Sequence, residues 1–112
     1  MKKIEAIIRP TRFEAVKAAL SELGIRGITV TSVHGEVLGT SRTFTYRSHE
    51  YCIGLTSKLK VELVVGAREA GDVVQAVLDA ARTGEIDDGH VFVYEVGEAI
   101  RICNCQRDEA AV

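Results

Sequence analysis

The segment at residues 82–90 contains a turn whose backbone amides could bind an anion. It reads Arg-Thr-Gly-Glu-Ile-Asp-Asp-Gly-His, and its Asp-Gly pair indicates a tight turn that leads into a strand. The exposed amides of such a turn can form a nest that binds an anion. Because Asp-Gly pairs also occur in ordinary turns, the pattern alone favours a plain turn. Evidence for a binding site must come from the surrounding chain.

A pair of cysteines is the second candidate for chemistry. Cys103 and Cys105 form a C-x-C pair, one residue closer together than the C-x-x-C pair of thioredoxin-like proteins. Two thiols do not complete a zinc site, although His90 or a second copy of the chain could add a ligand. We expect no metal, and a metal or redox role stays an alternative. Because the sequence has no nucleophile paired with a base, we predict no catalytic residues and no enzyme activity.

An internal repeat predicts the elements that hold these residues. Residues 3–8 (Lys-Ile-Glu-Ala-Ile-Ile) recur at 60–65 as Lys-Val-Glu-Leu-Val-Val, and both runs have the β-branched composition of strands. A helical pattern follows each strand. The first helix is predicted to start at the capping-box pair Thr11 and Glu14 and to stop at Gly24.

The second helix and two further strands complete the pattern. Apolar residues recur at helical spacing between 70 and 81, and a strand is expected after each helix, at 28–34 and at 90–96. Two strand–helix–strand halves in one short chain predict an α+β fold, the ferredoxin-like double βαβ arrangement.

Composition limits the class of protein. A chain of 112 residues with 46% hydrophobic and 27% charged residues fits a single globular domain over 1–112. Its net charge of −2 argues against general nucleic-acid binding. The longest apolar stretch, residues 61–67, is interrupted by Glu62 and is too short for membrane insertion. With no export signal and three cysteines in no framework spacing, we expect a cytoplasmic protein.

The predicted sheet is apolar on both faces, although two helices can cover only one of them. Neighbouring strand positions are apolar at Val64, Val65, Val91, Phe92 and Val93. Strands of this kind are normally buried on both sides. We therefore expect the second face to meet another copy of the chain in a homo-oligomer.

The stretch from 36 to 57 differs from the rest of the chain. It is rich in glycine, hydroxyl residues, arginine and aromatic residues and has little apolar periodicity. Loops of this length in compact domains are usually functional. A loop that contacts a partner is the favoured interpretation, and a solvated hairpin is the alternative.

Several parts of the chain resemble the PII signal-transduction proteins. Residues 83–90 are similar to the family's Thr-Gly-x-Ile-x-Asp-Gly-x signature, and residues 2–10 and 24–31 resemble other runs of the family. Further similarity lies at Tyr46-Arg47, Glu50-Tyr51 and Ile100-Arg101-Ile102. The resemblance covers nearly the whole chain.

This resemblance implies a homotrimer that binds adenine nucleotides in clefts between neighbouring subunits. Residues 36–57 would be the T-loop that docks on a target protein, 82–90 the nucleotide-contacting turn, and 101–112 a C-terminal loop. One subunit would contribute Ile7, Gly35, Val64, Asp88, Gly89 and His90. The next would contribute Gly27, Ile28, Thr29, Glu62 and Arg101. For Ile7 and Val64, simple core packing explains the residue equally well.

The chemistry of these residues suits a nucleotide. Backbone at Gly35 and Gly89 can approach phosphate closely because glycine has no Cβ. Thr29 offers a hydroxyl to adenine, and Glu62 can accept from ribose or base. Arg101 supplies a forked cation for phosphate.

The chain departs from the family's pattern around the expected phosphates. Leu38 and Gly39 stand where the family usually has arginine and glutamine, His90 where it has lysine, and Cys103 where it has arginine. Gly39 has no oxygen for the magnesium that links ATP to 2-oxoglutarate in typical members. The loss of cations should weaken ATP most. We therefore expect ADP or AMP to be favoured, with ATP still possible, and 2-oxoglutarate to bind poorly.

A small anion could bind instead at the base of the T-loop. Lys58 matches a family lysine that meets 2-oxoglutarate, and the amides of Val37, Leu38, Gly39 and Thr40 could turn inward around an anion. PII-like proteins of the carboxysome- and bicarbonate-associated type have similarly lost the 2-oxoglutarate apparatus. The resemblance therefore implies a non-catalytic regulator of an unknown transporter or enzyme, with bicarbonate as a possible ligand. A nitrogen-regulatory PII protein with a rewritten T-loop is the alternative.

Overall fold

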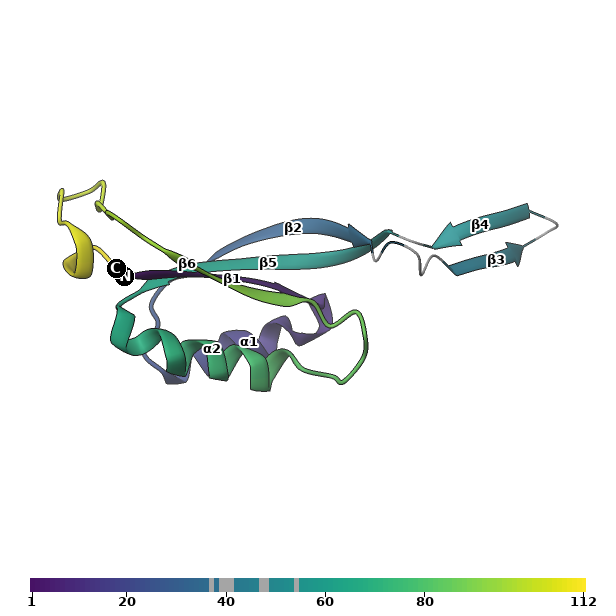
Figure 1. Cartoon of the computed structure of the whole chain (residues 1–112), viewed down its shortest axis with the longest axis horizontal. Coiled ribbons are helices and arrows are strands. Elements are labelled where there is room, and N and C mark those ends of the chain that lie inside the picture. The colour runs from purple at the N-terminus through teal and green to yellow at the C-terminus, as the bar shows by residue number, and fades with distance from the viewer. Residues whose placement is uncertain (37, 39–41, 47–48, 54) are drawn as a thin grey trace.

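The computed structural model describes residues 1–36, 38, 42–46, 49–53 and 55–112. Its centre is an antiparallel four-stranded sheet in the order β2-β5-β1-β6 (Figure 1). The strands run over Lys2–Ile8 (β1), Thr29–Glu36 (β2), Leu55–Val65 (β5) and His90–Glu95 (β6). The order places the two repeated strands, β1 and β5, side by side at the centre. The predicted ferredoxin-like fold is confirmed.

Helices α1 (Phe13–Glu22) and α2 (Ala67–Ala81) pack together under one face of the sheet (Figure 1). Alternate residues of β1 and β5 point into this layer because side chains alternate along a strand. The buried core consists of Ile4, Ala6, Ile8, Val16, Leu20, Val61, Leu63, Val65, Ala70, Val73, Val77 and Ala81. The apolar stripe predicted for the second helix is therefore the face that α2 buries.

The start of α1 differs from the sequence prediction. Residues Pro10–Arg12 form a 3₁₀ turn, the N-cap is Arg12, and no side chain caps the helix. The capping box expected from Thr11 and Glu14 is therefore wrong, because Pro10 starts a separate turn that shifts the helix by one residue. The predicted stop is confirmed: Gly24 has φ +83°, a conformation that glycine adopts without strain.

Strands β2 and β5 continue beyond the rest of the sheet as a two-stranded arm. Their pairing runs from Thr29 opposite Glu62 to Glu36 opposite Leu55. Beyond the arm, β3 (Arg42–Tyr46) and β4 (His49–Ile53) pair in a separate antiparallel sheet (Figure 1). Of the predicted T-loop, residues 36 and 55–57 thus belong to β2 and β5, whereas β3 and β4 form a separate two-stranded unit beyond the sheet (Figure 1).

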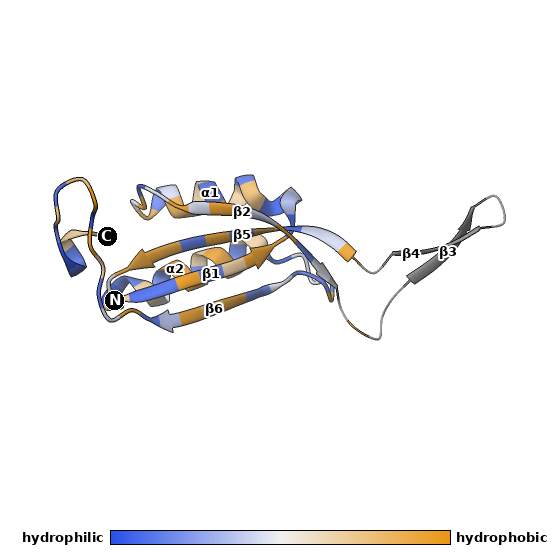
Figure 2. Ribbon diagram, turned by 90° about the horizontal axis from the view of Figure 1, so that it is seen from above, coloured by the Kyte–Doolittle hydropathy of each residue, from blue (hydrophilic) through white to orange (hydrophobic). Residues whose placement is uncertain are grey.

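Strand β6 forms one edge of the sheet and is hydrophobic in its middle, at residues 91–93, with hydrophilic residues toward both ends (Figure 2). Phe92 and Val93 are each about half exposed, at 45% and 50%, although they are neighbours on a strand and point to opposite faces. Val65, by contrast, belongs to the core. Apolar side chains therefore occur on both faces of the sheet: β6, one of its two edge strands, exposes Phe92 and Val93, and β5 has half-buried Val64 on the face opposite the core residue Val65. Within the described residues, no helix is long and apolar enough to cross a membrane.

Candidate functional site

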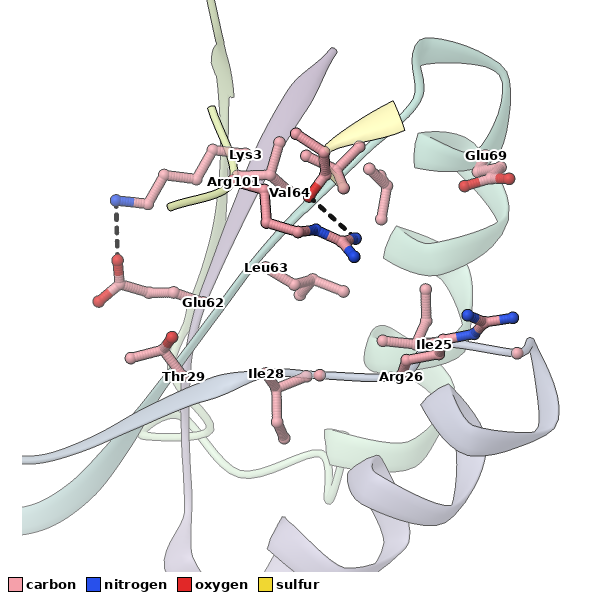
Figure 3. A pocket seen from close by; sticks show the side chains of 15 residues that line it. Lys3, Ile25, Arg26, Ile28, Thr29, Glu62, Leu63, Val64, Glu69 and Arg101 are labelled. Atoms are coloured by element: carbon pink, nitrogen blue, oxygen red, sulfur yellow. Dashed lines mark hydrogen bonds and ion pairs between the residues drawn. The ribbon is translucent and has the colours of Figure 1, made fainter. Parts of the chain in front are cut away.

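A cavity of about 810 Å³ lies between the sheet, the loop after α1 and the C-terminal segment (Figure 3). Strand pairing creates its polar wall, because the register sets Thr29 of β2 directly opposite Glu62 of β5. Val64, also on β5, and Ile28 add apolar surface. Arg101 enters from the C-terminal segment. The volume is within the usual range for a small-molecule site, roughly 300–1,000 Å³.

Glu62 supplies a negative charge on the strand wall of this cavity. Its Oε2 atom lies 2.7 Å from the Lys3 Nζ, and its Oε1 atom lies 3.6 Å from the Lys60 Nζ. The hydrogen bond from Lys3 lowers the pKa of Glu62 below its ordinary value and raises the pKa of Lys3. Glu62 is therefore an ionised acceptor at neutral pH, able to take hydrogen bonds from ligand hydroxyl or amino groups.

Arg101 supplies a positive charge from a folded-back segment. Its amide donates to the Gln106 carbonyl at 2.8 Å, and its carbonyl accepts from the Cys105 amide at 2.8 Å. These two bonds close the loop and fix the backbone of Arg101. Its Nη2 atom donates to the Ala111 carbonyl at 3.4 Å (Figure 3). The guanidinium thus contacts one neutral acceptor, and phosphate is the stronger partner for its fork.

A second cavity, of about 440 Å³, lies between β6, the end of β1 and α2. Ile7, Asp88, Gly89 and His90 line it. The ring of His90 stacks on that of Phe92, with centroids 5.8 Å apart. The second cavity therefore gathers the turn that the sequence singles out for binding an anion.

The carboxylate of Asp88 holds this turn together. Its Oδ2 atom accepts from the amides of Thr83 and Gly84, both at 2.9 Å. Its Oδ1 atom accepts from the Thr83 hydroxyl and from the Arg9 Nε, the latter at 2.9 Å. These bonds, led by that of Thr83, hold the pKa of Asp88 far below its ordinary value. The side chain thus organises the turn, so a ligand would meet the backbone around it.

Gly89 is required by packing. It has φ +107°, and a Cβ atom there would stand 1.8 Å from the Ile7 carbonyl oxygen. Gly35 is different, since a Cβ atom there would make only an ordinary contact, 3.8 Å from the Lys58 Cγ. Gly89 therefore lies close against the backbone of Ile7.

The sequence-derived site residues separate into two sets that share no lining residue. Ile7, Asp88, Gly89 and His90 line the second cavity, and Gly35 lies on the β2–β5 arm outside both. The first cavity gathers Gly27, Ile28, Thr29, Glu62, Val64 and Arg101. Within one subunit, Val64 thus lines the same cavity as Thr29 and Glu62. Lys3 and Val64 pair across β1 and β5, which explains this position.

The expected anion site at the base of the T-loop lies partly outside the described residues. Val37, Gly39 and Thr40 lie outside the described residues, and Leu38 is 86% exposed. Lys58 is buried, and its ammonium donates to the carbonyl of Asp87. This lysine thus already has a partner within the protein.

The cysteine pair is exposed at both positions, Cys103 and Cys105. Among the described residues, no group of three or more histidine, cysteine or acidic side chains is placed to hold a metal ion.

Sequence reasoning missed several residues that line the first cavity. Arg26 and Glu69 add charge, and Ala111 and Val112 form a wall from the C-terminal segment. No motif marks Ala111 and Val112, because the chain folds back between residues 99 and 108 to bring this wall into place. Lys3 could have been found, because it lies in the repeat that also contains Glu62.

The chain is similar to known proteins over its full length. A family model described as nitrogen regulatory protein P-II matches residues 1–106. Nitrogen regulatory protein P-II of Rhodospirillum rubrum is 44% identical over 112 residues, which is 100% of both chains. Nitrogen regulatory protein P-II 1 of Escherichia coli is 41% identical over the same length and coverage.

A solved structure agrees with these relatives. The crystal structure of Arabidopsis thaliana PII bound to citrate has a TM-score of 0.80 and 37% sequence identity, covering 99% of this chain and 91% of that chain. Agreement in sequence, length and fold leaves one conclusion. The chain belongs to the PII family of signal-transduction proteins.

Proposed function

We propose that this protein is a non-catalytic PII-type regulator that binds an adenine nucleotide between subunits of a homotrimer. The observation that carries the proposal is the first cavity, where Thr29, Glu62 and Arg101 meet around apolar surface from Val64. A hydroxyl and a carboxylate can receive the base and ribose, and a guanidinium can receive phosphate.

Within one subunit, the two cavities that hold the candidate site residues share no lining residue. This separation supports a site that is formed by two neighbouring subunits of a trimer. A nucleotide held by Arg101 of one subunit would meet the turn at 88–90 of its neighbour, so each copy would contribute one half of the site. The half-exposed apolar residues of β6, Phe92 and Val93, supply surface for a subunit contact. Homotrimers of identical subunits form such sites at each of three equivalent interfaces.

The preferred nucleotide follows from the charge around the phosphates. His90 lines the second cavity, and Cys103 lies two residues beyond Arg101. Neither is a lysine or an arginine, the residue types that the family places at these positions. Because ATP carries the most negative charge, ADP and AMP should compete with it well.

The output of the regulator is proposed to be a contact between the T-loop and a target transporter or enzyme. The described part of this loop, β3 and β4, lies beyond the sheet, where a second protein can reach it (Figure 1). A ligand that orders the base of the loop would change the surface offered to the target.

The second ligand is proposed to be a small anion at the base of the T-loop. Gly39 cannot ligate magnesium through a side chain, which favours bicarbonate over 2-oxoglutarate and a link to inorganic carbon. The names of the relatives favour nitrogen regulation instead. The citrate bound by the Arabidopsis protein supports a carboxylate-type anion as a ligand class.

Titration calorimetry with ADP, AMP and ATP tests the nucleotide site. We expect ADP to bind the wild-type protein, and Arg101→Ala to weaken it at least about tenfold, since charge-assisted hydrogen bonds contribute roughly 1.5–3 kcal/mol. Arg68→Ala is the control, because Arg68 is exposed on α2 and lines neither cavity. Equal ADP affinity in Arg101→Ala and wild type would rule out the proposed site.

A second titration separates the two anions. The dissociation constant of ADP is measured at several bicarbonate concentrations, at fixed pH and ionic strength, and that of ATP with magnesium and 2-oxoglutarate. If bicarbonate binds beside the nucleotide, it tightens ADP, and ADP tightens bicarbonate by the same factor. A flat bicarbonate response together with tighter ATP binding would favour nitrogen regulation.

A further inference from the structure

Lys58 is a buried lysine with an assigned partner. The residue is 7% exposed, and its ammonium donates to the backbone carbonyl of Asp87. Lysine is almost never buried unless it is paired, because its charge loses solvation. Burial of Lys58 therefore costs solvation free energy, and the hydrogen bond to Asp87 offsets this cost.

Strand register explains how Lys58 reaches the turn. The last pair between β1 and β5 joins Ile8 to Leu59, so Lys58 lies just beyond the paired end of β1, next to Arg9. Arg9 binds the carboxylates of Asp87 and Asp88. Arg9 and Lys58 thus hold the same turn. Arg9 binds the side chains of Asp87 and Asp88, and Lys58 binds the backbone of Asp87.

The stem of Lys58 belongs to the base of the β2–β5 arm. Lys58 pairs with Val33 of β2, and its Cγ lies 3.8 Å from where a Cβ of Gly35 would stand. Two residues earlier on β5, the Thr56 hydroxyl donates to the Gly35 carbonyl at 3.2 Å. The residue therefore spans from the arm that carries the T-loop to the turn that faces a ligand.

We propose that Lys58 is a positioning residue that couples the base of the T-loop arm to the nucleotide-contacting turn. Its ammonium fixes the Asp87 carbonyl, and through it the backbone of Asp88 and Gly89 that follows. Movement of β5 at the arm base then moves the turn, and a ligand at the turn restrains the arm. This inference rests on the proposed nucleotide function, which it deepens, and it differs from a direct role of Lys58 as an anion ligand.

Amide hydrogen exchange on the full-length, ligand-free protein tests the positioning role. In Lys58→Met, which keeps the stem and removes the charge, we expect amides of 84–89 to exchange about tenfold faster or more, with core amides of β1 unchanged. Lys58→Arg, which keeps a donor, should restore part of the protection. Lys17→Met, an exposed lysine on α1, should change neither. Unchanged exchange at 84–89 in Lys58→Met overturns the proposal.

Addition of ADP tests the coupling. In wild type, ADP should slow exchange at 35 and 56–58 as well as at 84–89, and in Lys58→Met the response at 35 and 56–58 should disappear. If ADP slows the arm amides equally in both proteins, the coupling is wrong. If wild type binds no ADP, the proposed nucleotide function fails, whereas the ligand-free exchange still decides the positioning role.

A measurement on the wild-type protein covers the case in which Lys58→Met does not fold. Nitrogen-15 NMR should show a solvent-protected Lys58 ammonium resonance in the ligand-free protein, since a hydrogen-bonded, buried ammonium exchanges slowly. A resonance that exchanges as fast as that of an exposed lysine would contradict the contact and with it the proposal.

Discussion

The carbonyl oxygen of Ile7 occupies the space in which a side chain of Gly89 would have to stand. A Cβ atom at Gly89 would lie 1.8 Å from that oxygen and 2.8 Å from the carbonyl carbon. The contact arises because Ile7 pairs with His90, the residue after Gly89, as β1 meets β6. Because Gly89 has no side chain, the turn that is proposed to face phosphate can pack directly against the backbone of β1.

Gly89→Ala is therefore expected to move the turn and destabilise the fold. Backbone strain at φ +107° and the clash with Ile7 act together, so the free energy of unfolding should fall by about 3 kcal/mol or more. Gly84→Ala is the matched control. Gly84 has φ +88° but open space around a Cβ, so its cost should be only about 1–2 kcal/mol. Urea unfolding at one protein concentration measures both; equal losses would show that the Ile7 contact is not decisive.

The pH dependence of stability should contain a contribution from Asp88. The folded protein lowers the pKa of this carboxyl, whereas in the unfolded chain it stays near its ordinary value of about 4. The unfolded state therefore binds the proton first as pH falls. The stability from Asp88 is fully present above about pH 4 and is lost progressively below it, toward the folded pKa.

Asp88→Asn should reduce this acid sensitivity. Between about pH 5 and about pH 3, the free energy of unfolding should fall less steeply in the variant than in wild type. Asp79→Asn serves as the control, since Asp79 is bonded only to Gln75 on the exposed face of α2, among described residues. A variant slope identical to that of wild type would mean that the bonds from Thr83 and Arg9 do not favour the charged form.

The sequence predicted most of the layered fold because its signals are local. The repeat at 3–8 and 60–65 identified the two central strands, and the stripe from Ala70 to Ala81 identified the buried face of α2. Gly24 correctly marked the end of α1. The start of α1 was missed because two turn signals overlap there, and the 3₁₀ turn at Pro10 took precedence over the capping spacing of Thr11.

The candidate site was harder to predict because it depends on contacts distant in sequence. The resemblance to the PII family indicated Thr29, Glu62 and Arg101, and strand register and loop closure bring them to one cavity. No pattern in the sequence could show that Lys58 donates to a carbonyl at Asp87, because any residue has a carbonyl. The wall formed by Ala111 and Val112 was missed for the same reason.

Ile4→Ala should cause a large loss of stability. Ile4 is fully buried at the centre of β1, opposite Leu63 of β5 and Val93 of β6. Removing three carbons from such a site typically lowers the free energy of unfolding by about 2–5 kcal/mol. Ile86→Ala is the control, because Ile86 is 82% exposed and should lose less than about 0.5 kcal/mol. Similar losses at both positions in urea unfolding would contradict the assigned core.

The hydroxyl of Thr29 offers the sharpest test of which cavity receives the base. Thr29→Val keeps the shape and the β-branched character that suit a strand, and it removes only the polar group. If the hydroxyl bonds to adenine, ADP affinity should fall about 2- to 12-fold, the equivalent of roughly 0.5–1.5 kcal/mol, with the thermal midpoint unchanged. Thr31→Val provides the comparison, since Thr31 lies two residues further along β2 and outside the cavity. Calorimetry on both variants decides the matter: a loss of affinity at Thr31 but none at Thr29 would place the base elsewhere on the sheet.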